Sequence, residues 1–236
     1  MNPLLLIQNL TEEALPILSE VAQETTTVES IRFFEMAVKG GWLMIPLLLL
    51  SGLAIYIFID RFRVLRAASK EDPTFMNRIR DYIVEGNTAS AINLCKKTDN
   101  PSSRMIEKGI SRIGRPMNDV QIAIENVGNI EVSKMERGMS ILASVAGGAP
   151  MIGFLGTVMG MVRAFFDMSS AGNNVDISVL SSGIYTAMVT TVAGLIVGIC
   201  AFFAYNFLIS RVNNIVSRME SKTMEFMDLL NEPIKK

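Results

Sequence analysis

The stretch GGAPMIGFLGTVMGMV, residues 147–162, lies within an apolar span that runs from Ile141 to Phe166. The stretch is rich in glycine and contains one hydroxyl side chain, that of Thr157. A second apolar span, Val179 to Ile209, has no charged residue, and the first has only Arg163, near one end. Such spans are typical of membrane helices that pack closely and place a few hydroxyls around something polar. A pore wall or a transport scaffold needs this arrangement, whereas an ordinary anchor does not.

The composition supports a membrane protein. Of the 236 residues, 50% are hydrophobic and 19% are charged, and soluble domains usually carry more charge. The net charge of −1 gives no reason to expect nucleic acid as a partner. We therefore expect the lipid bilayer to be the surroundings of much of the chain.

The residue types that usually carry catalysis are missing or isolated. The chain has no histidine, which excludes the commonest general base and the commonest metal ligand. Cys95 lies in a polar stretch and Cys200 in an apolar one, so we expect neither a disulfide nor a metal site. The sequence also lacks a nucleophile elbow and a phosphate-binding loop. We expect no enzyme, no cofactor and no bound metal.

Three spans reach the roughly 20 residues that cross a bilayer core, the first of them starting near Gly41. Trp42 at its start suits an interfacial anchor. Pro150 in the second span is expected to kink or loosen a helix unless neighbouring helices cover the carbonyl that it frees. The fold class that we predict is all-α, a polytopic membrane protein with three transmembrane helices and extended helices that protrude into the cytoplasm.

The distribution of basic residues predicts the orientation. Lys and Arg concentrate between residues 61 and 137 and in the tail, whereas residues 1–40 are acidic and the connector between spans two and three has no basic residue. The positive-inside rule then places the N-terminus outside. Helical periodicity and turn signals divide the inner region into several helices, and an apolar stripe continues the third span as one long helix. The predicted segments are an outer amphipathic segment 1–40, transmembrane helix 41–60, cytoplasmic helical domain 61–140, transmembrane helix 141–166, outer connector 167–178, transmembrane helix 179–209 and cytoplasmic C-terminal helix 210–236.

Small residues and threonines form one stripe on each of the last two spans. Two interpretations stay open from the stripes alone: helix-to-helix packing with the threonines bonded to their own helix, or the wall of an ion path. No acidic residue, lysine or histidine lies in the middle of a span, and Arg163, toward the outer end, is expected to snorkel or to pair with Asp167. If ions cross, the titrating group should therefore come from another polypeptide. The candidate ion-path or pore-lining residues are Thr157, Thr191, Thr186, Gly153, Gly160, Ala187, Gly194 and Gly198.

Three segments resemble the MotA/TolQ/ExbB proton-channel family, and the ExbB and TolQ branch fits best. They are MERGMSILASVAGGAPMIGFLGTVMGMVRAF (135–165), GIYTAMVTTVAGLIVGICAFFAYN (183–206) and FFEMAVKGGWLMIPLLLLSGLAIYIFIDR (33–61). The resemblance implies a subunit of an inner-membrane motor in bacteria. Five such subunits would surround single helices of an ExbD-like partner that carries the ion-binding aspartate, and the motor would energise a TonB-like protein. The resemblance assigns the two ion-path threonines to Thr157 and Thr191, whereas Thr190 faces elsewhere and is expected to be a packing residue.

One position departs from the pattern of this family. Many relatives carry a glutamate where this chain has Thr186, so an ion path here would depend on hydroxyls, water and the carboxylate of the partner. Two further interpretations remain beside the ExbB-like one. They are a TolQ-like or gliding-motor subunit, and a structural membrane scaffold that conducts no ions.

Overall fold

The computed structural model describes residues 41–70, 72–170 and 177–231, and every regular element in these ranges is an α-helix. The all-α prediction with three membrane spans is confirmed, because three helical stretches are long and apolar enough to cross a bilayer. The predicted outer segment 1–40 lies outside the described residues. The helices are α3 (Met44–Ala68), α4 (Phe75–Val84), α5 (Thr88–Thr98), α6 (Pro101–Ile110), α7 (Met117–Glu136), α8 (Met139–Ser170) and α9 (Ile177–Asn231).

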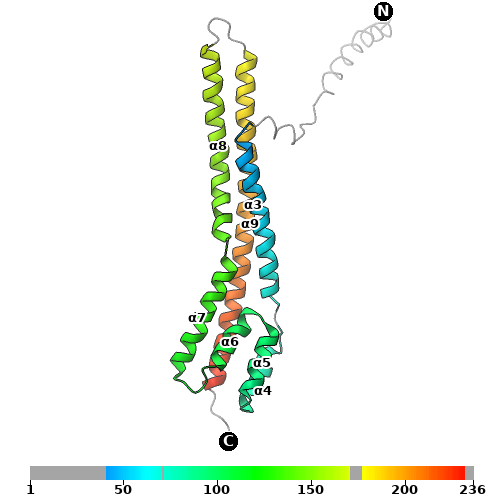
Figure 1. The fold of residues 1–236 in the computed structure, drawn as a ribbon, viewed down its shortest axis with the longest axis vertical. Coiled ribbons are helices and arrows are strands. Elements are labelled where there is room, and N and C mark those ends of the chain that lie inside the picture. The colour runs from blue at the N-terminus through cyan, green and yellow to red at the C-terminus, as the bar shows by residue number, and fades with distance from the viewer. Residues whose placement is uncertain (1–40, 71, 171–176, 232–236) are drawn as a thin grey trace, which may run out of the picture.

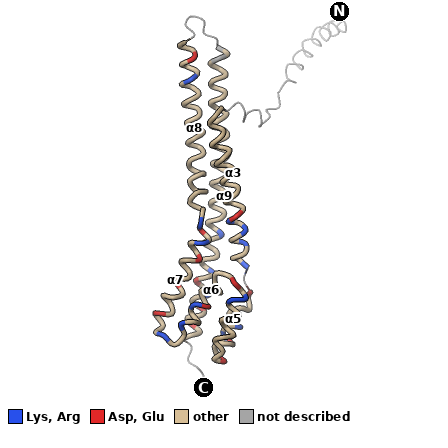
Figure 2. The backbone as a smooth tube through the Cα atoms, viewed as in Figure 1, with Lys and Arg blue, Asp and Glu red and all other residues tan. Residues whose placement is uncertain are grey.

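Three long helices run side by side through most of the molecule (Figure 1). α8 and α9 form an antiparallel pair that extends beyond the start of α3, and α3 packs along α9. Charged side chains are sparse along the upper part of these helices (Figure 2), where α8 carries Arg163 and Asp167 near its end. This end is called the connection end below, and the opposite end, where the short helices gather, is called the basal end.

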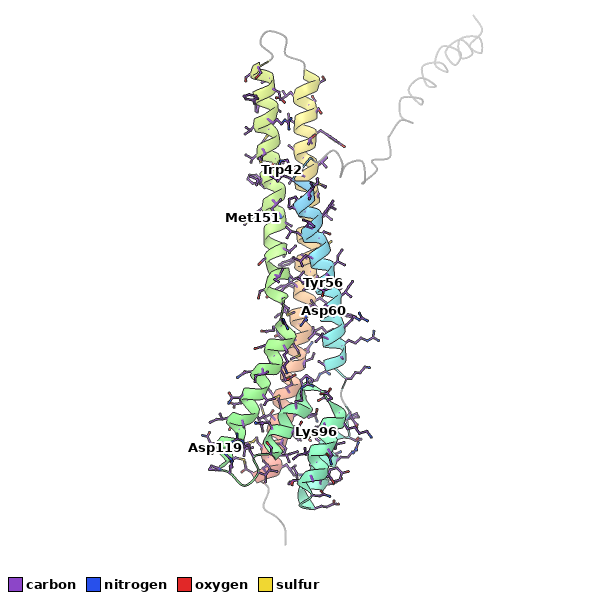
Figure 3. All side chains as sticks on the ribbon, viewed as in Figure 1. Trp42, Tyr56, Asp60, Lys96, Asp119 and Met151 are labelled. Carbon is purple, nitrogen blue, oxygen red and sulfur yellow. The ribbon has the colours of Figure 1, made fainter. Side chains whose placement is uncertain are left out.

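Large apolar side chains point away from the three helices. Trp42 at the start of α3, Tyr56 on α3 and Met151 on α8 are 67%, 69% and 73% exposed (Figure 3). Helices that are apolar on their outer face as well as their inner face are stable in a bilayer and not in water. The structure therefore shows a multi-pass membrane protein.

α9 continues far beyond the membrane-spanning length. Its 55 residues give about 80 Å at 1.5 Å per residue, whereas a hydrocarbon core is about 30 Å thick. Its basal half keeps an apolar stripe whose members Val212, Ile215, Met219 and Phe226 are buried. One helix thus continues from the third span into the C-terminal segment, as far as Asn231.

The helices α4, α5, α6 and α7 gather at this basal half of α9. These four helices and the part of α9 from residue 210 to 231 are together called the basal domain. The Asn87 side chain caps α5, and Asn100 forms a capping box with Ser103 that starts α6. The Phe226 ring contacts the backbone of α6 at Gly109, since a Cβ added to that glycine would lie 2.6 Å from the ring. The residue pattern by itself did not indicate α6 as a separate helix.

A charged cluster joins α6 to α7 in the basal domain. Arg104 on α6 and Lys134 on α7 both bind the buried Glu131, at 2.6 and 2.7 Å. Burial by itself would raise the pKa of Glu131, but these hydrogen bonds and charges outweigh it and lower the pKa. Arg61 on α3 donates to the Lys134 carbonyl at 2.9 Å, so the cluster also connects the basal domain to a membrane helix.

Candidate functional site

The two apolar helices that carry the predicted site are in contact at their backbones. A Cβ added to Gly194 on α9 would lie 2.6 Å from the Ala149 carbonyl oxygen and 2.8 Å from the Gly153 Cα on α8. Real side chains do not approach so closely, so the absence of a Cβ at Gly194 and Gly153 sets the distance between the helices. This line of contact between α8 and α9 is called the seam.

Pro150 and Gly198 form one level of the seam. A proline in a helix leaves the carbonyl four residues earlier without its backbone donor, which here is the Ala146 carbonyl. α8 is nevertheless continuous through Pro150, and a Cβ on Gly198 would overlap the proline ring and lie 3.1 Å from the Ala146 oxygen. α9 therefore covers the freed carbonyl, as the sequence analysis required.

Two further levels of the seam pair a glycine with a side chain. Gly156 lies against Thr190, because a Cβ added to Gly156 would overlap the Thr190 hydroxyl. Gly160 lies against Ala187, because a Cβ added to Gly160 would lie 2.7 Å from the Ala187 Cβ. Thr190 is 2% exposed and donates to the Ala187 carbonyl of its own helix. Its expected role as a packing residue fits this position.

The two threonines predicted to line an ion path differ in their hydrogen bonds. The Thr191 hydroxyl crosses the seam and donates to the Gly153 carbonyl at 2.8 Å. The Thr157 hydroxyl donates to the Phe154 carbonyl of its own helix at 2.6 Å. Both residues are partly exposed, whereas Thr190 is buried. A hydroxyl that donates one hydrogen bond still has lone pairs that can accept others.

Thr186 lies nearer the connection end, in a hollow of about 440 Å³ between α8 and α9 that is lined by polar side chains and by a larger apolar surface. Arg163, Asp167 and Ser182 also line this hollow. An ion pair between Arg163 and Asp167 was one expectation from the sequence, but among the described residues neither side chain forms one, and both are exposed. Within the described part of α8 and α9, the seam itself contains no charged side chain between Arg163 and the basal end.

The structure brings all the predicted residues except Thr157 to the interface of α8 and α9, while the one printed contact of the Thr157 side chain is with its own helix. Gly153, Gly160, Ala187, Gly194 and Gly198 lie in the seam of a single chain, where they permit the close approach. The seam residues that the sequence analysis did not select, Gly156 and Ala149, occupy the same faces at helical spacing. Their spacing was visible in the sequence, but it did not show which residue of the other helix each one meets. No group of three or more potential metal ligands occurs in the described ranges.

These features define a class of protein. It is a multi-pass membrane protein with two helices in backbone contact, hydroxyls at their seam and a large basal domain. The model of the MotA/TolQ/ExbB proton channel family matches residues 97–221, which is more than half of the chain. The match includes α6, α7, α8 and the membrane part of α9. The chain therefore belongs to the MotA/TolQ/ExbB proton channel family.

Relatives within this family are similar over most of the chain. An ExbB homologue from Methanothermobacter thermautotrophicus is 29% identical over 198 residues, 80% of this chain and 69% of the relative. The Tol-Pal system protein TolQ of Haemophilus influenzae is 28% identical, over 84% of this chain and 92% of the relative. The biopolymer transport protein ExbB of Neisseria gonorrhoeae is 28% identical, over 69% of this chain and 78% of the relative.

The family and the structure together establish the general role of the chain. It is a membrane component of a proton channel of the ExbB and TolQ kind, and members of this family are transport components and not enzymes. The family also implies a partner of the ExbD or TolR type.

Proposed function

We propose that the chain is the ExbB-like subunit of a motor that converts proton-motive force into movement. Several copies, as in the predicted pentamer, would surround the single membrane helices of an ExbD-like partner. The complex would energise a TonB-like protein and, through it, transport across an outer membrane. The observation that carries the proposal is the charge-free membrane region of α8 and α9, which holds two partly exposed threonines, Thr191 bonded across the seam and Thr157 on α8.

In this proposal the partner supplies an aspartate and the seam supplies the groups that hold it. A charged carboxylate costs about 2.5–3.5 kcal/mol at the bilayer centre even on the lenient insertion scale, so it needs hydrogen-bond donors. The Thr157 and Thr191 hydroxyls can provide them by rotating away from the Phe154 and Gly153 carbonyls. A protonated carboxyl has one O–H, which would donate to a lone pair of one hydroxyl at a time, so that both hydroxyl-to-carbonyl bonds stay intact.

This difference gives each protonation state its own set of contacts. When the partner's aspartate is ionised, the hydroxyls give up their carbonyl bonds and bind it tightly. When it takes up a proton, the hydroxyls return to the carbonyls and the partner helix is free to move to the next subunit. Thr186, which lines the hollow nearer the connection end, would admit water to this site. The glycines of the seam would keep the two hydroxyl-bearing helices at a fixed spacing.

The basal end of the molecule would face the cytoplasm and the connection end the opposite side of the membrane. The N-terminus would face the periplasm of a bacterial cell, together with segment 1–40 and the connector 167–178. The basal domain and the 210–236 segment would lie in the cytoplasm. The basic residues at the basal end support this orientation through the positive-inside rule (Figure 2).

Proton flux in liposomes tests the proposed ion path. The chain is reconstituted with its ExbD/TolR-type partner, and acidification is measured under an imposed membrane potential. Thr191→Val and Thr157→Val keep the side-chain volume but remove the hydroxyl, and each is expected to lower partner-dependent flux about tenfold, the effect of one lost hydrogen bond in the transition state. Thr191→Ser keeps the hydroxyl and should keep most of the flux.

Thr190→Val is the matched control, because Thr190 is the neighbouring hydroxyl and is enclosed in the seam. It should leave the flux unchanged. Undiminished flux in both Thr157→Val and Thr191→Val would refute the proposed ion path. A complex that assembles normally and shows no partner-dependent flux at all would instead support the structural scaffold.

A further inference from the structure

A second feature of the membrane region lies outside the seam, between α3 and α9. The two helices enclose a groove of about 640 Å³ that is almost entirely apolar, a size typical of ligand pockets. Ala54 on α3 and Ala201 on α9 are buried at its floor, while Phe58, Phe203 and Phe207 are among the large side chains that line it. The groove exists because small side chains face each other where large ones would have filled the space between the helices.

The basal end of the groove is cationic. A second hollow of about 240 Å³ follows along the same two helices, and both Arg66 and Arg211 line it. The Arg211 guanidinium lies over the Phe207 ring, 5.2 Å from its centroid, so an aromatic side chain of the groove holds this cation in place. Phe62 stacks on Phe207 with centroids 6.2 Å apart and joins the two hollows.

These two arginines have no carboxylate partner among the described residues. Arg61, five residues before Arg66, binds Asp60 and the Lys134 carbonyl instead. Arg66 and Arg211 are exposed and form no ion pair within the described ranges, so their charge is available to an anion from outside the chain. An arginine fork binds the oxygens of a phosphate with good geometry.

The length of the groove matches one leaflet of a bilayer. From Ile196 to Phe207 the lining residues of α9 span about 16 Å at 1.5 Å per residue. Half of a 30 Å hydrocarbon core is about 15 Å. An acyl chain in the groove would therefore place its headgroup toward the basal end, where charged residues begin on α3 at Asp60 and on α9 at Arg211.

We propose that this groove binds one membrane phospholipid, with an acyl chain against Ala54 and Ala201 and the phosphate between Arg66 and Arg211. The lipid would fill the space between α3 and the long helix that carries Thr191. It would belong to the leaflet on the side of the basic residues. The inference is independent of the proposed ion path, because it depends only on the α3–α9 groove and its two cations.

Native mass spectrometry of the complete complex tests the proposal. The complex is exchanged into detergent, supplied with phosphatidylglycerol, and the lipids retained per chain are counted. Arg66→Gln and Arg211→Gln should each weaken retention about fivefold, the effect of one basic residue on an anionic lipid. Arg63→Gln is the matched control, since it removes the same charge from the same helix outside the groove, and it should change nothing.

A second pair of variants tests the acyl-chain site. Cys200 lines the groove and is exposed, so Cys200→Trp should fill it and abolish retention with both arginines present. Ile199, the preceding residue, is 52% exposed and is not among the residues that line the groove, so Ile199→Trp should retain the lipid.

Three results would overturn the proposal. The first is unchanged retention in both arginine variants and in Cys200→Trp. The second is displacement of the lipid by inorganic phosphate at equal concentration, which would show that only the anion is bound. The third is an altered oligomer mass in Cys200→Trp without any loss of lipid, which would show that a second copy of the chain occupies the groove.

Discussion

Gly194→Ala is predicted to separate the two helices of the seam. The new Cβ would lie 2.6 Å from the Ala149 carbonyl oxygen, and ordinary contact begins at 3.4 Å, so the deficit is about 0.8 Å. Backbone atoms of α8 lie on the other side of the contact, and a backbone cannot move aside as a flexible side chain can. α9 must therefore shift away from α8 as a whole.

The cost of this shift has three contributions. Overpacking of this kind costs about 1–3 kcal/mol. The Thr191–Gly153 hydrogen bond would lengthen from 2.8 Å to beyond bonding distance, which costs about 1 kcal/mol more. Alanine is the better helix former by about 0.8 kcal/mol and offsets part of the loss. The net destabilisation is about 1–3 kcal/mol.

Titration with SDS in mixed micelles, followed by circular dichroism, measures this change in the free energy of unfolding. Gly147→Ala is the control, because Gly147 lies on α8 and a Cβ added there would have nothing within 4 Å. It should raise the stability by about 0.5–1 kcal/mol through helix propensity alone. A Gly194→Ala protein at least as stable as the wild type would refute the argument that glycine sets the spacing of the seam.

Three other predictions concern the basal domain. Because the pKa of Glu131 is lowered on folding, its ionised form stabilises the fold fully above about pH 4.5, and this stabilisation is lost as the pH falls through the lower pKa of the folded state. Glu131→Gln should lower the free energy of unfolding by about 1–3 kcal/mol at pH 7. It should also make thermal denaturation less dependent on acid pH. Burial, with a smaller effect of the Glu107 charge, raises the pKa of the Cys95 thiol to about 12. In a Cys200→Ser protein, where Cys95 is the remaining thiol, maleimide at pH 8 should therefore modify Cys95 about a thousandfold more slowly than a free thiol. This protection should be lost when the domain unfolds. Phe226→Ala removes a fully buried ring and should lower the free energy of unfolding by about 3–5 kcal/mol, measured by the same SDS titration.

The membrane architecture was predictable because it depends on properties of single segments. Length and apolar composition are enough to identify a span, and the three predicted spans correspond to the three helical stretches that the structure provides. The continuity of α9 was predictable for a similar reason, since its apolar stripe continues without a glycine or proline from Val212 to Phe226. Membership of the family was predictable from the two signature segments that form the seam.

The sequence by itself therefore determined the class, the three spans, the long helix and the two hydroxyl-bearing faces. Only the tertiary structure decided which residues meet: Gly153 with Thr191, Pro150 with Gly198, and Gly156 with Thr190. It also opened the groove between α3 and α9 and brought Arg66 and Arg211 to the lining of one hollow. The physical reason is that helical periodicity fixes the face on which a residue lies. The register between two faces depends instead on contacts of a few ångströms, to which both helices contribute at once.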